Sequence, residues 1–144
     1  MGVKTAKLNQ EFEKVSRNRD LFSDFNHIFL PHPNTGEISR KTNVDAVKLA
    51  IRNIVLTNKY ERLRNPNFGG NISRFLFEPV EPQLAREIED HIKFLIEEFE
   101  PRANIINVHA EVSPDESEIY VNIVFSVITS GFQEEVDLTL YRVR

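Results

Sequence analysis

Glu100, Pro101 and Arg102 place an acid and a guanidinium on either side of a proline, directly after an apolar helical pattern that ends at Phe99. Proline lacks the backbone N–H and disfavours helical dihedrals at the residue before it, so the helix must stop there. The planar fork of arginine can hold a carboxylate or two carbonyl oxygens at once. We therefore predict a stiff corner at which Glu100, Pro101 and Arg102 bind polar groups of a partner protein.

Paired carboxylates are the other chemistry that these residue types offer. Glycoside hydrolases hold two carboxyl groups about 5–9.5 Å apart and raise the pKa of one of them. Glu78, Glu81 and Glu100 lie next to prolines that would stiffen such a pair, but none has an evident apolar pocket around it. With 22 acidic residues, some pair will meet that distance by chance. We predict no catalytic residue and keep a cell-wall-degrading enzyme as an alternative.

Metal and cofactor sites are not predicted. The chain has no cysteine, which excludes disulfides and thiolate metal sites. The segment from Asn65 to Asn71 holds two glycines but lacks the lysine and the spacing of a phosphate-binding loop. The spacing of the four histidines does not match a metal-binding motif. They are His27, His32, His91 and His109.

Composition narrows the class of protein further. A chain of 144 residues fits one folded domain with an ordinary core. The net charge is −4 with basic residues interspersed among acids, which disfavours nucleic acid as a partner. No apolar run approaches the ~18 residues of a membrane span, and the polar N-terminus lacks the apolar core of a secretory signal.

Two strong helices are predicted from apolar residues at helical spacing. The first begins at Thr42 or Asn43, either of which could cap it, and ends near Thr57. The second runs from about Pro82 to Phe99. Between them we expect a short strand at 60–64, a tight loop at 65–71 and a helical turn at 72–76. The apolar stripes are Val44, Val47, Ile51, Ile54 and Val55 in the first helix and Leu84, Ile88, Ile92, Leu95, Ile96 and Phe99 in the second.

Three alternating strands follow, with turns at 113–116 and 130–131. They predict a meander with one apolar face, in which Ile106, Val108, Ala110 and Val112 share the inner side of the first strand. The fold class is therefore α+β, with two main helices packed on one face of a small, mainly antiparallel sheet.

The last strand is expected to be an edge strand that can accept a strand from a partner. The alternative is an edge without a partner, protected by its charges. The residues predicted to bind protein are Val136, Leu138, Leu140 and Tyr141, and the protecting charges are Glu134, Glu135, Asp137 and Arg142.

Residues 1–42 are predicted to be an N-terminal arm and linker, and residues 43–144 the folded domain. Residues 1–20 are polar and are expected to form a mobile arm or a weak helix. An apolar cluster then precedes a turn-rich segment, and it packs either on the domain's own surface or on a neighbouring subunit. The cluster consists of Leu21, Phe22, Phe25, Ile28, Phe29 and Leu30.

An ordered set of motifs carries a family resemblance from Val44 to Tyr141. The motifs are Ile51-Arg52-Asn53-Ile54, Glu61-Arg62, Asn65-Pro66-Asn67-Phe68-Gly69, Leu76-Phe77-Glu78-Pro79, Phe99-Glu100-Pro101-Arg102 and Val121-Asn122-Ile123-Val124-Phe125-Ser126-Val127. Together they resemble the small baseplate wedge proteins of contractile phage tails, called gene-25-like or lysozyme-like wedge subunits, which have a relative in the type VI secretion baseplate. One departure is Leu63, where relatives often carry proline after the arginine.

The resemblance implies an α+β structural subunit without cofactors, located in the tail baseplate of a virion and assembled in the host cytoplasm. It implies that Glu100, Pro101 and Arg102 dock on the core bundle formed by other baseplate wedge subunits. It also implies that the edge near Val136 to Tyr141 pairs with arms of the tail sheath protein and so starts the sheath. The lysozyme label is an activity claim that the residues do not support. A regulatory binding adaptor is a further alternative, because a bacterial anti-adaptor is similar in fold.

Overall fold

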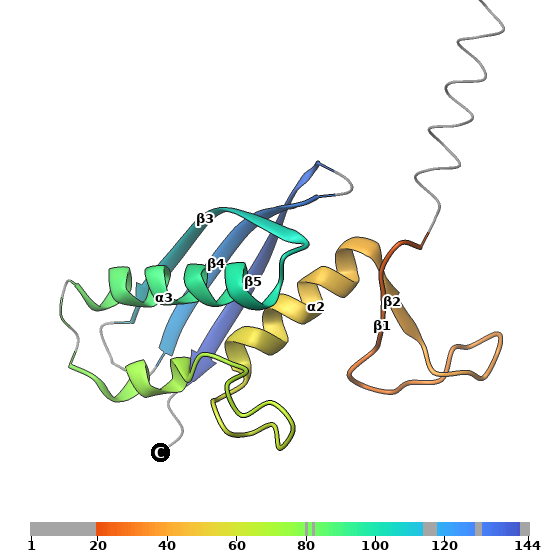
Figure 1. Ribbon diagram of the computed structural model, residues 1–144, viewed down its shortest axis with the longest axis horizontal. Coiled ribbons are helices and arrows are strands. Elements are labelled where there is room, and N and C mark those ends of the chain that lie inside the picture. Colours follow the sequence, from red (N-terminus) through yellow and green to blue (C-terminus); the bar gives the residue numbers. More distant parts are fainter. Residues whose placement is uncertain (1–19, 80, 82, 114–117, 129–130, 142–144) are drawn as a thin grey trace, which may run out of the picture. The chain divides into compact units, whose positions relative to one another are not determined.

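The computed structural model describes residues 20–79, 81, 83–113, 118–128 and 131–141 (Figure 1). Its contacts divide the chain into two compact units that meet between Asn43 and Val44. The arm expected at residues 1–20 lies almost wholly outside the described residues, as does Arg142. Each unit has its own secondary structure and is described by itself.

The described part of the first unit is a small β-hairpin. Strand β1 (Ser23–Phe25) pairs antiparallel with β2 (Arg40–Thr42), and an isolated bridge joins Pro31 to Ile38. Both strands are too short to bury a face, and large apolar side chains of the unit are exposed. These are Leu21, Phe25, Ile28, Phe29, Leu30 and Ile38.

The predicted first helix is confirmed as α2 (Asn43–Leu56). Its buried residues include Val47, Ile51 and Ile54, as the helical spacing predicts. Asn43 is one of the two predicted capping residues of this helix. Its side-chain Oδ1 instead accepts a hydrogen bond from the N–H of Leu21 at 2.9 Å. After the loop at 57–71, the expected helical turn is a 3-10 helix, η1 (Ile72–Phe77).

The second helix is confirmed as α3 (Leu84–Phe99), with Pro82 outside the described residues. Five of its six predicted stripe residues are buried and Phe99 is half-buried. Burying each should contribute roughly 1.5–3 kcal/mol. The helix stops at Phe99, and Glu100 has the non-helical dihedrals φ −130° and ψ 73°. The proline that follows therefore ends the helix as predicted.

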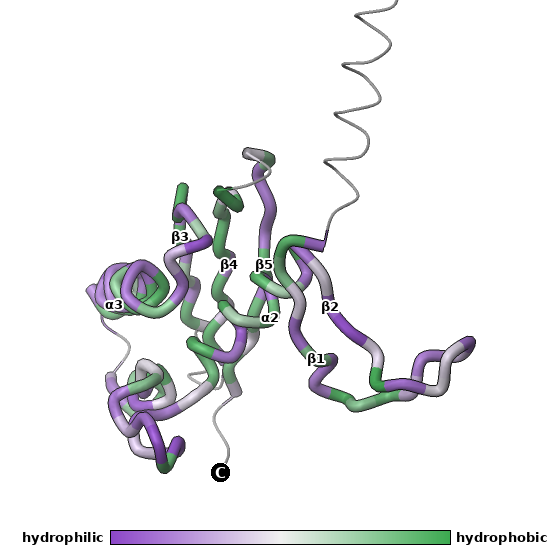
Figure 2. Tube along the Cα trace, turned by 45° about the vertical axis from the view of Figure 1, so that its right-hand side comes forward, coloured by the Kyte–Doolittle hydropathy of each residue, from purple (hydrophilic) through white to green (hydrophobic). Residues whose placement is uncertain are grey.

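The strands β3 (Ala103–Val112), β4 (Glu118–Val127) and β5 (Gln133–Tyr141) form the predicted antiparallel meander in the order β3-β4-β5. Hydrophobic and hydrophilic residues alternate along these strands (Figure 2). The pairing shifts between Ile105 and Asn107, where β3 carries a bulge. The prediction that Ile106 faces the core is wrong, because the bulge leaves it 47% exposed.

The core lies on one face of this sheet. Phe125 and Ile123 of β4 are fully buried, whereas their strand neighbours on the other face are at least partly exposed. Figure 1 shows α3 and α2 on the same side of the sheet. The α+β fold with helices on one face of an antiparallel sheet is therefore confirmed. Among the described residues, no helix has the length and apolar character needed to cross a membrane.

Candidate functional site

The corner after α3 is built around an ion pair within the chain. Arg102 Nε lies 2.5 Å from Glu100 Oε1, and Arg102 Nη2 lies 2.6 Å from Glu100 Oε2. Glu100 is only 3% exposed, whereas the Arg102 side chain is 35% exposed. The guanidinium thus binds the carboxylate through two parallel hydrogen bonds. This bidentate geometry is the strong form of an arginine–carboxylate ion pair.

Backbone bonds fix the same corner. The N–H of Glu100 donates to the Ile96 carbonyl at 2.8 Å, and the N–H of Ala103 donates to the Glu100 carbonyl at 3.1 Å. The carbonyl of Arg102 accepts the N–H of Ile128 at 3.1 Å. The backbone hydrogen bonds therefore connect the corner to both α3 and the sheet, and they hold it in a fixed conformation.

This geometry changes the role of Glu100. Both of its oxygens face Arg102 and its side chain is buried, so it positions the arginine and is not itself presented to a partner. Pro101 is exposed and Arg102 is half-exposed, so these two residues form the surface of the corner. Their binding of a partner remains a prediction.

The β3 edge of the sheet is covered by a side chain from α3. The N–H of Ala110 donates to Glu89 Oε1 at 2.9 Å, and His109 Nδ1 lies 3.3 Å from the same oxygen. Glu89 therefore accepts a hydrogen bond from a backbone N–H that a strand of another protein would need in order to pair with β3. Glu89 is not one of the predicted stripe residues of α3, and nothing in its spacing indicates this contact.

The bond to Glu89 also fixes which residues of β5 face outward. Because the Ala110 N–H points away from β4, Ala110 and its partner Val121 form a non-hydrogen-bonded pair. Val121 must then bond to β5 through its pair with Leu138. The bonds from Ser113 N to Glu118 O and from Ile128 N to Arg102 O fit the same alternation. The N–H groups of Asp137 and Thr139 consequently point away from β4, to the side of β5 on which no other described strand pairs.

The predicted binding residues of β5 therefore contribute differently from what the sequence indicates. Leu138 and Leu140 are buried, Val136 is half-buried, and the main chain at all three positions faces β4. Only Tyr141 of the predicted set has an exposed side chain. Main-chain pairing with a partner would thus use Asp137, Thr139 and Tyr141. Sequence reasoning missed the first two because the alternation depends on register.

One of the charges expected to protect the β5 edge is engaged elsewhere. Glu134 Oε2 lies 2.9 Å from Lys48 Nζ of α2. Glu134 has the same parity along the strand as Val136 and Leu138, so its side chain is directed to the helix-covered face. Asp137 accepts a bond from Asn122 Nδ2 at 2.7 Å on the opposite face.

The three candidate catalytic carboxylates do not share a pocket in the described chain. Glu78 and Glu81 are exposed, and Glu100 is buried against Arg102. The cavity beside Glu78, which Glu118 also lines, has a volume of about 10 Å³. This is room for about one water molecule and far too little for a sugar ring.

A larger hollow of about 240 Å³ lies on the face of the sheet opposite α3 and α2. Its lining includes His109, Glu111, Tyr120 and Asp137. The Tyr120 hydroxyl donates to Glu118, and this bond, with the nearby negative charge, raises the pKa of Tyr120. The hollow is smaller than the 300–1,000 Å³ typical of small-molecule sites.

The histidines do not come together. His27 and His32 are exposed in the hairpin, and His91 Nε2 lies 2.7 Å from the Gly70 carbonyl oxygen. Within the part of the chain that the structure describes, no group of three or more potential ligands could hold a metal ion.

Comparison with known proteins gives a consistent result in sequence and fold. The family model described as "Baseplate wedge protein gp25" matches residues 41–131. The baseplate wedge protein gp25 of Enterobacteria phage T4 is 32% identical over 92 residues, which cover 64% of this chain and 70% of that protein.

Solved structures are similar in fold at lower sequence identity. A crystal structure of a Geobacter sulfurreducens protein named as a candidate tail lysozyme has a TM-score of 0.62 and 23% identity, covering 68% of this chain and 89% of that one. A chain of the anti-feeding prophage baseplate has a TM-score of 0.59 and 22% identity, covering 83% of this chain and 85% of that one. At these identities the two likenesses establish the fold alone.

Proposed function

Because this chain belongs to the gp25 family of baseplate wedge proteins, we propose that it is a structural subunit of a contractile tail baseplate. Its place is then the tail baseplate of a virion, and it is assembled in the host cytoplasm. Its partners are other wedge subunits and the tail sheath protein. The protein makes two contacts: its corner docks on the wedge, and one edge of its sheet starts the sheath.

The docking contact is the corner formed by Pro101 and Arg102. The paired Glu100 and the backbone bonds to Ile96 and Ile128 hold this corner in one geometry before any partner arrives. A rigid contact loses little conformational entropy on binding, which favours affinity. The partner is the helical core bundle of the larger wedge proteins, as the family resemblance implies.

A double substitution tests this docking role without leaving an unpaired buried charge. Arg102→Ala alone would strand the Glu100 carboxylate and lower the free energy of unfolding by about 2–3 kcal/mol, so a loss of binding could reflect misfolding. The double variant Glu100→Gln with Arg102→Gln removes both charges and keeps two amides that can bond. We expect it to fold and to co-purify poorly with wedge partners. Normal incorporation would remove the docking role.

The sheath-initiating contact is the free edge of β5. The observation that carries it is the contrast between the two edges of the sheet. Glu89 occupies the Ala110 donor on β3, whereas among the described residues β5 pairs only with β4. Strand addition at β5 would extend the sheet through the outward main chain of Asp137 and Thr139.

Thr139→Pro tests strand addition at this edge. Proline removes the outward N–H at this position while the bonds between β5 and β4 stay in place, and proline is tolerated on edge strands. We expect baseplates that contain the variant but do not grow sheath, as seen by electron microscopy of assembled particles. The matched control Thr139→Ala keeps the N–H and should assemble normally. Sheaths of normal length on Thr139→Pro would contradict the proposal.

A further inference from the structure

The loop between α2 and η1, residues 57–71, is a closed and well-fixed structure. The N–H of Tyr60 donates to the Pro66 carbonyl at 2.8 Å and closes its tip. At its base, Gly70 N donates to the Thr57 carbonyl at 3.2 Å. Ser73 Oγ lies 2.6 Å from Asn58 Oδ1 and ties the base to η1. These bonds hold the loop in one conformation without help from a partner.

The fixed loop presents apolar side chains to solvent. Leu63 is 100% exposed and Tyr60 is 79% exposed. Tyr60 also has a φ of 71°, in the left-handed region that bulky residues rarely adopt. Such backbone strain persists where surrounding bonds enforce it, and it is often associated with binding or switching. One exposed leucine is ordinary, but a strained tyrosine and a fully exposed leucine on one closed tip point to a contact surface.

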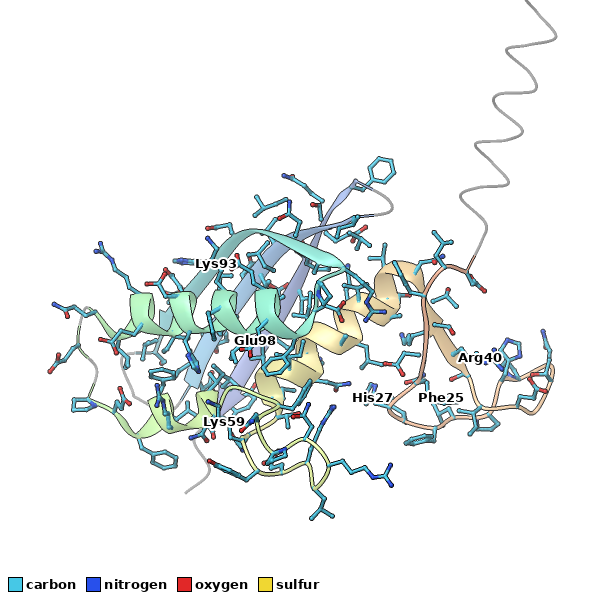
Figure 3. All side chains as sticks on the ribbon, in the orientation of Figure 1. Phe25, His27, Arg40, Lys59, Lys93 and Glu98 are labelled. Atoms are coloured by element: carbon cyan, nitrogen blue, oxygen red, sulfur yellow. The ribbon has the colours of Figure 1, made fainter. Side chains whose placement is uncertain are left out.

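The loop is basic within an acidic protein. It contains Lys59, Arg62 and Arg64 against the single acid Glu61, a net charge of +2, while the whole chain carries −4. Figure 3 shows Lys59 where the loop leaves α2. The Glu61 carboxylate already accepts the backbone N–H of Asn58 at 3.0 Å and its Nδ2 at 2.8 Å. A partner surface that fits this charge must carry carboxylates.

Aromatic contacts connect the loop to the docking corner. The Arg62 guanidinium carbon lies 3.6 Å from the centroid of the Phe68 ring, and the Phe68 ring lies 5.1 Å from the Phe99 ring. Phe99 directly precedes Glu100. The loop and the corner are therefore fixed to the same end of α3, and a partner docked at one lies close to the other.

We propose that the 57–71 loop is a second docking element of this protein. It inserts Leu63, together with Tyr60 of the same loop, into an apolar recess rimmed by carboxylates on the wedge partner that contacts the corner. Tyrosine and arginine are common among residues that carry most of an interface's binding energy. This inference rests on the proposed function, because it assumes that the corner docks on a wedge.

The test uses the full-length chain and baseplate intermediates purified from particles that lack it, with binding measured by titration. We expect Leu63→Ser to weaken binding at least about tenfold, as for a residue at the centre of an interface. Arg64→Glu should weaken binding by a similar factor, and more strongly at low salt than at high salt. Because both side chains are exposed, thermal unfolding of the variants should match wild type.

Phe77→Ser is the matched control, since Phe77 is also exposed but lies at the end of η1. Its neighbour Glu78 lines the same small cavity as Leu84 at the start of α3, so Phe77 lies at the opposite end of α3 from Phe99 and the corner. This variant should bind within about twofold of wild type. Wild-type binding by Leu63→Ser, or an equal loss in Leu63→Ser and Phe77→Ser, would overturn the inference. If the Glu100→Gln, Arg102→Gln variant loses binding while Leu63→Ser does not, the corner docks and the loop does not. If wild-type chain fails to bind, the proposed function itself is wrong.

Discussion

Two glycines with positive φ show how local surroundings decide the cost of a side chain. Gly69 has a φ of 94° and a Cβ built there would lie 2.2 Å from the backbone oxygen of Thr57. Gly131 has a φ of 66° and nothing within 4 Å of the same position. Both need the left-handed region, but only Gly69 also needs the close approach that joins the two ends of the 57–71 loop.

We predict that Gly69→Ala lowers the free energy of unfolding by about 3 kcal/mol, because it combines backbone strain with a clash against main chain. Gly131→Ala, which meets only the backbone strain, should cost about 1 kcal/mol. Urea unfolding followed by circular dichroism measures both values. Equal losses would show that the Thr57 contact is not a constraint on the folded chain.

At the residue scale, the sequence predicted where the helix ends at the corner but not how Glu100 is used there. Proline chemistry is local, so the end of α3 at Phe99 followed directly from Pro101. Whether Glu100 is buried or exposed depends on what α3 and the sheet place around it, and no spacing rule contains that information. The same holds for Glu89, whose contact with Ala110 joins residues 21 positions apart.

At the scale of an element, the loop at 57–71 is a case in which the residue pattern predicts the wrong secondary structure. The sequence predicted a strand at 60–64, and this is wrong, because the backbone turns back on itself at Arg62 and Asn65. The competing signal was the side chain of Glu61, which binds Asn58 and stabilises a turn there. The sheet was predictable because apolar and polar residues alternate over the whole length of its strands. The bulge at Ile106 interrupts this alternation, and no residue such as glycine marks it in the sequence.

We predict that Glu61 stabilises the 57–71 loop in a pH-dependent way. Bonds from the Asn58 side chain and backbone lower the pKa of Glu61 below its ordinary value of 4.5. A pKa lowered by folding adds stability that is present above 4.5 and is lost as the pH falls through the folded-state pKa. Nuclear magnetic resonance titration of the Glu61 carboxyl carbon measures this pKa. Asn58→Ala should move it back toward 4.5, Asn67→Ala should not, and an ordinary pKa in wild type would contradict the prediction.

For the whole molecule, the core is confined to one of the two units. Every buried apolar side chain of the described residues lies between Ala46 and Leu140, in the second unit. The hairpin of the first unit instead exposes six large apolar side chains, from Leu21 to Ile38. Exposed apolar clusters of this kind mark binding surfaces in soluble proteins. The sequence left two explanations open for this cluster, and each has a different consequence for stability.

Deleting residues 1–42 distinguishes the two explanations. If the cluster serves a neighbouring subunit, the shortened chain keeps its whole core, and we expect its thermal midpoint to stay within about 4 °C of the full chain, because 1 kcal/mol corresponds to roughly that shift. The shortened chain should also bind less of an apolar dye and enter baseplates less efficiently. If the cluster packs on its own domain, deletion exposes apolar surface of that domain, and the midpoint should fall by more than about 8 °C. Calorimetry of the two chains at equal concentration decides between these outcomes, because only the second couples the hairpin to the stability of the helices and sheet.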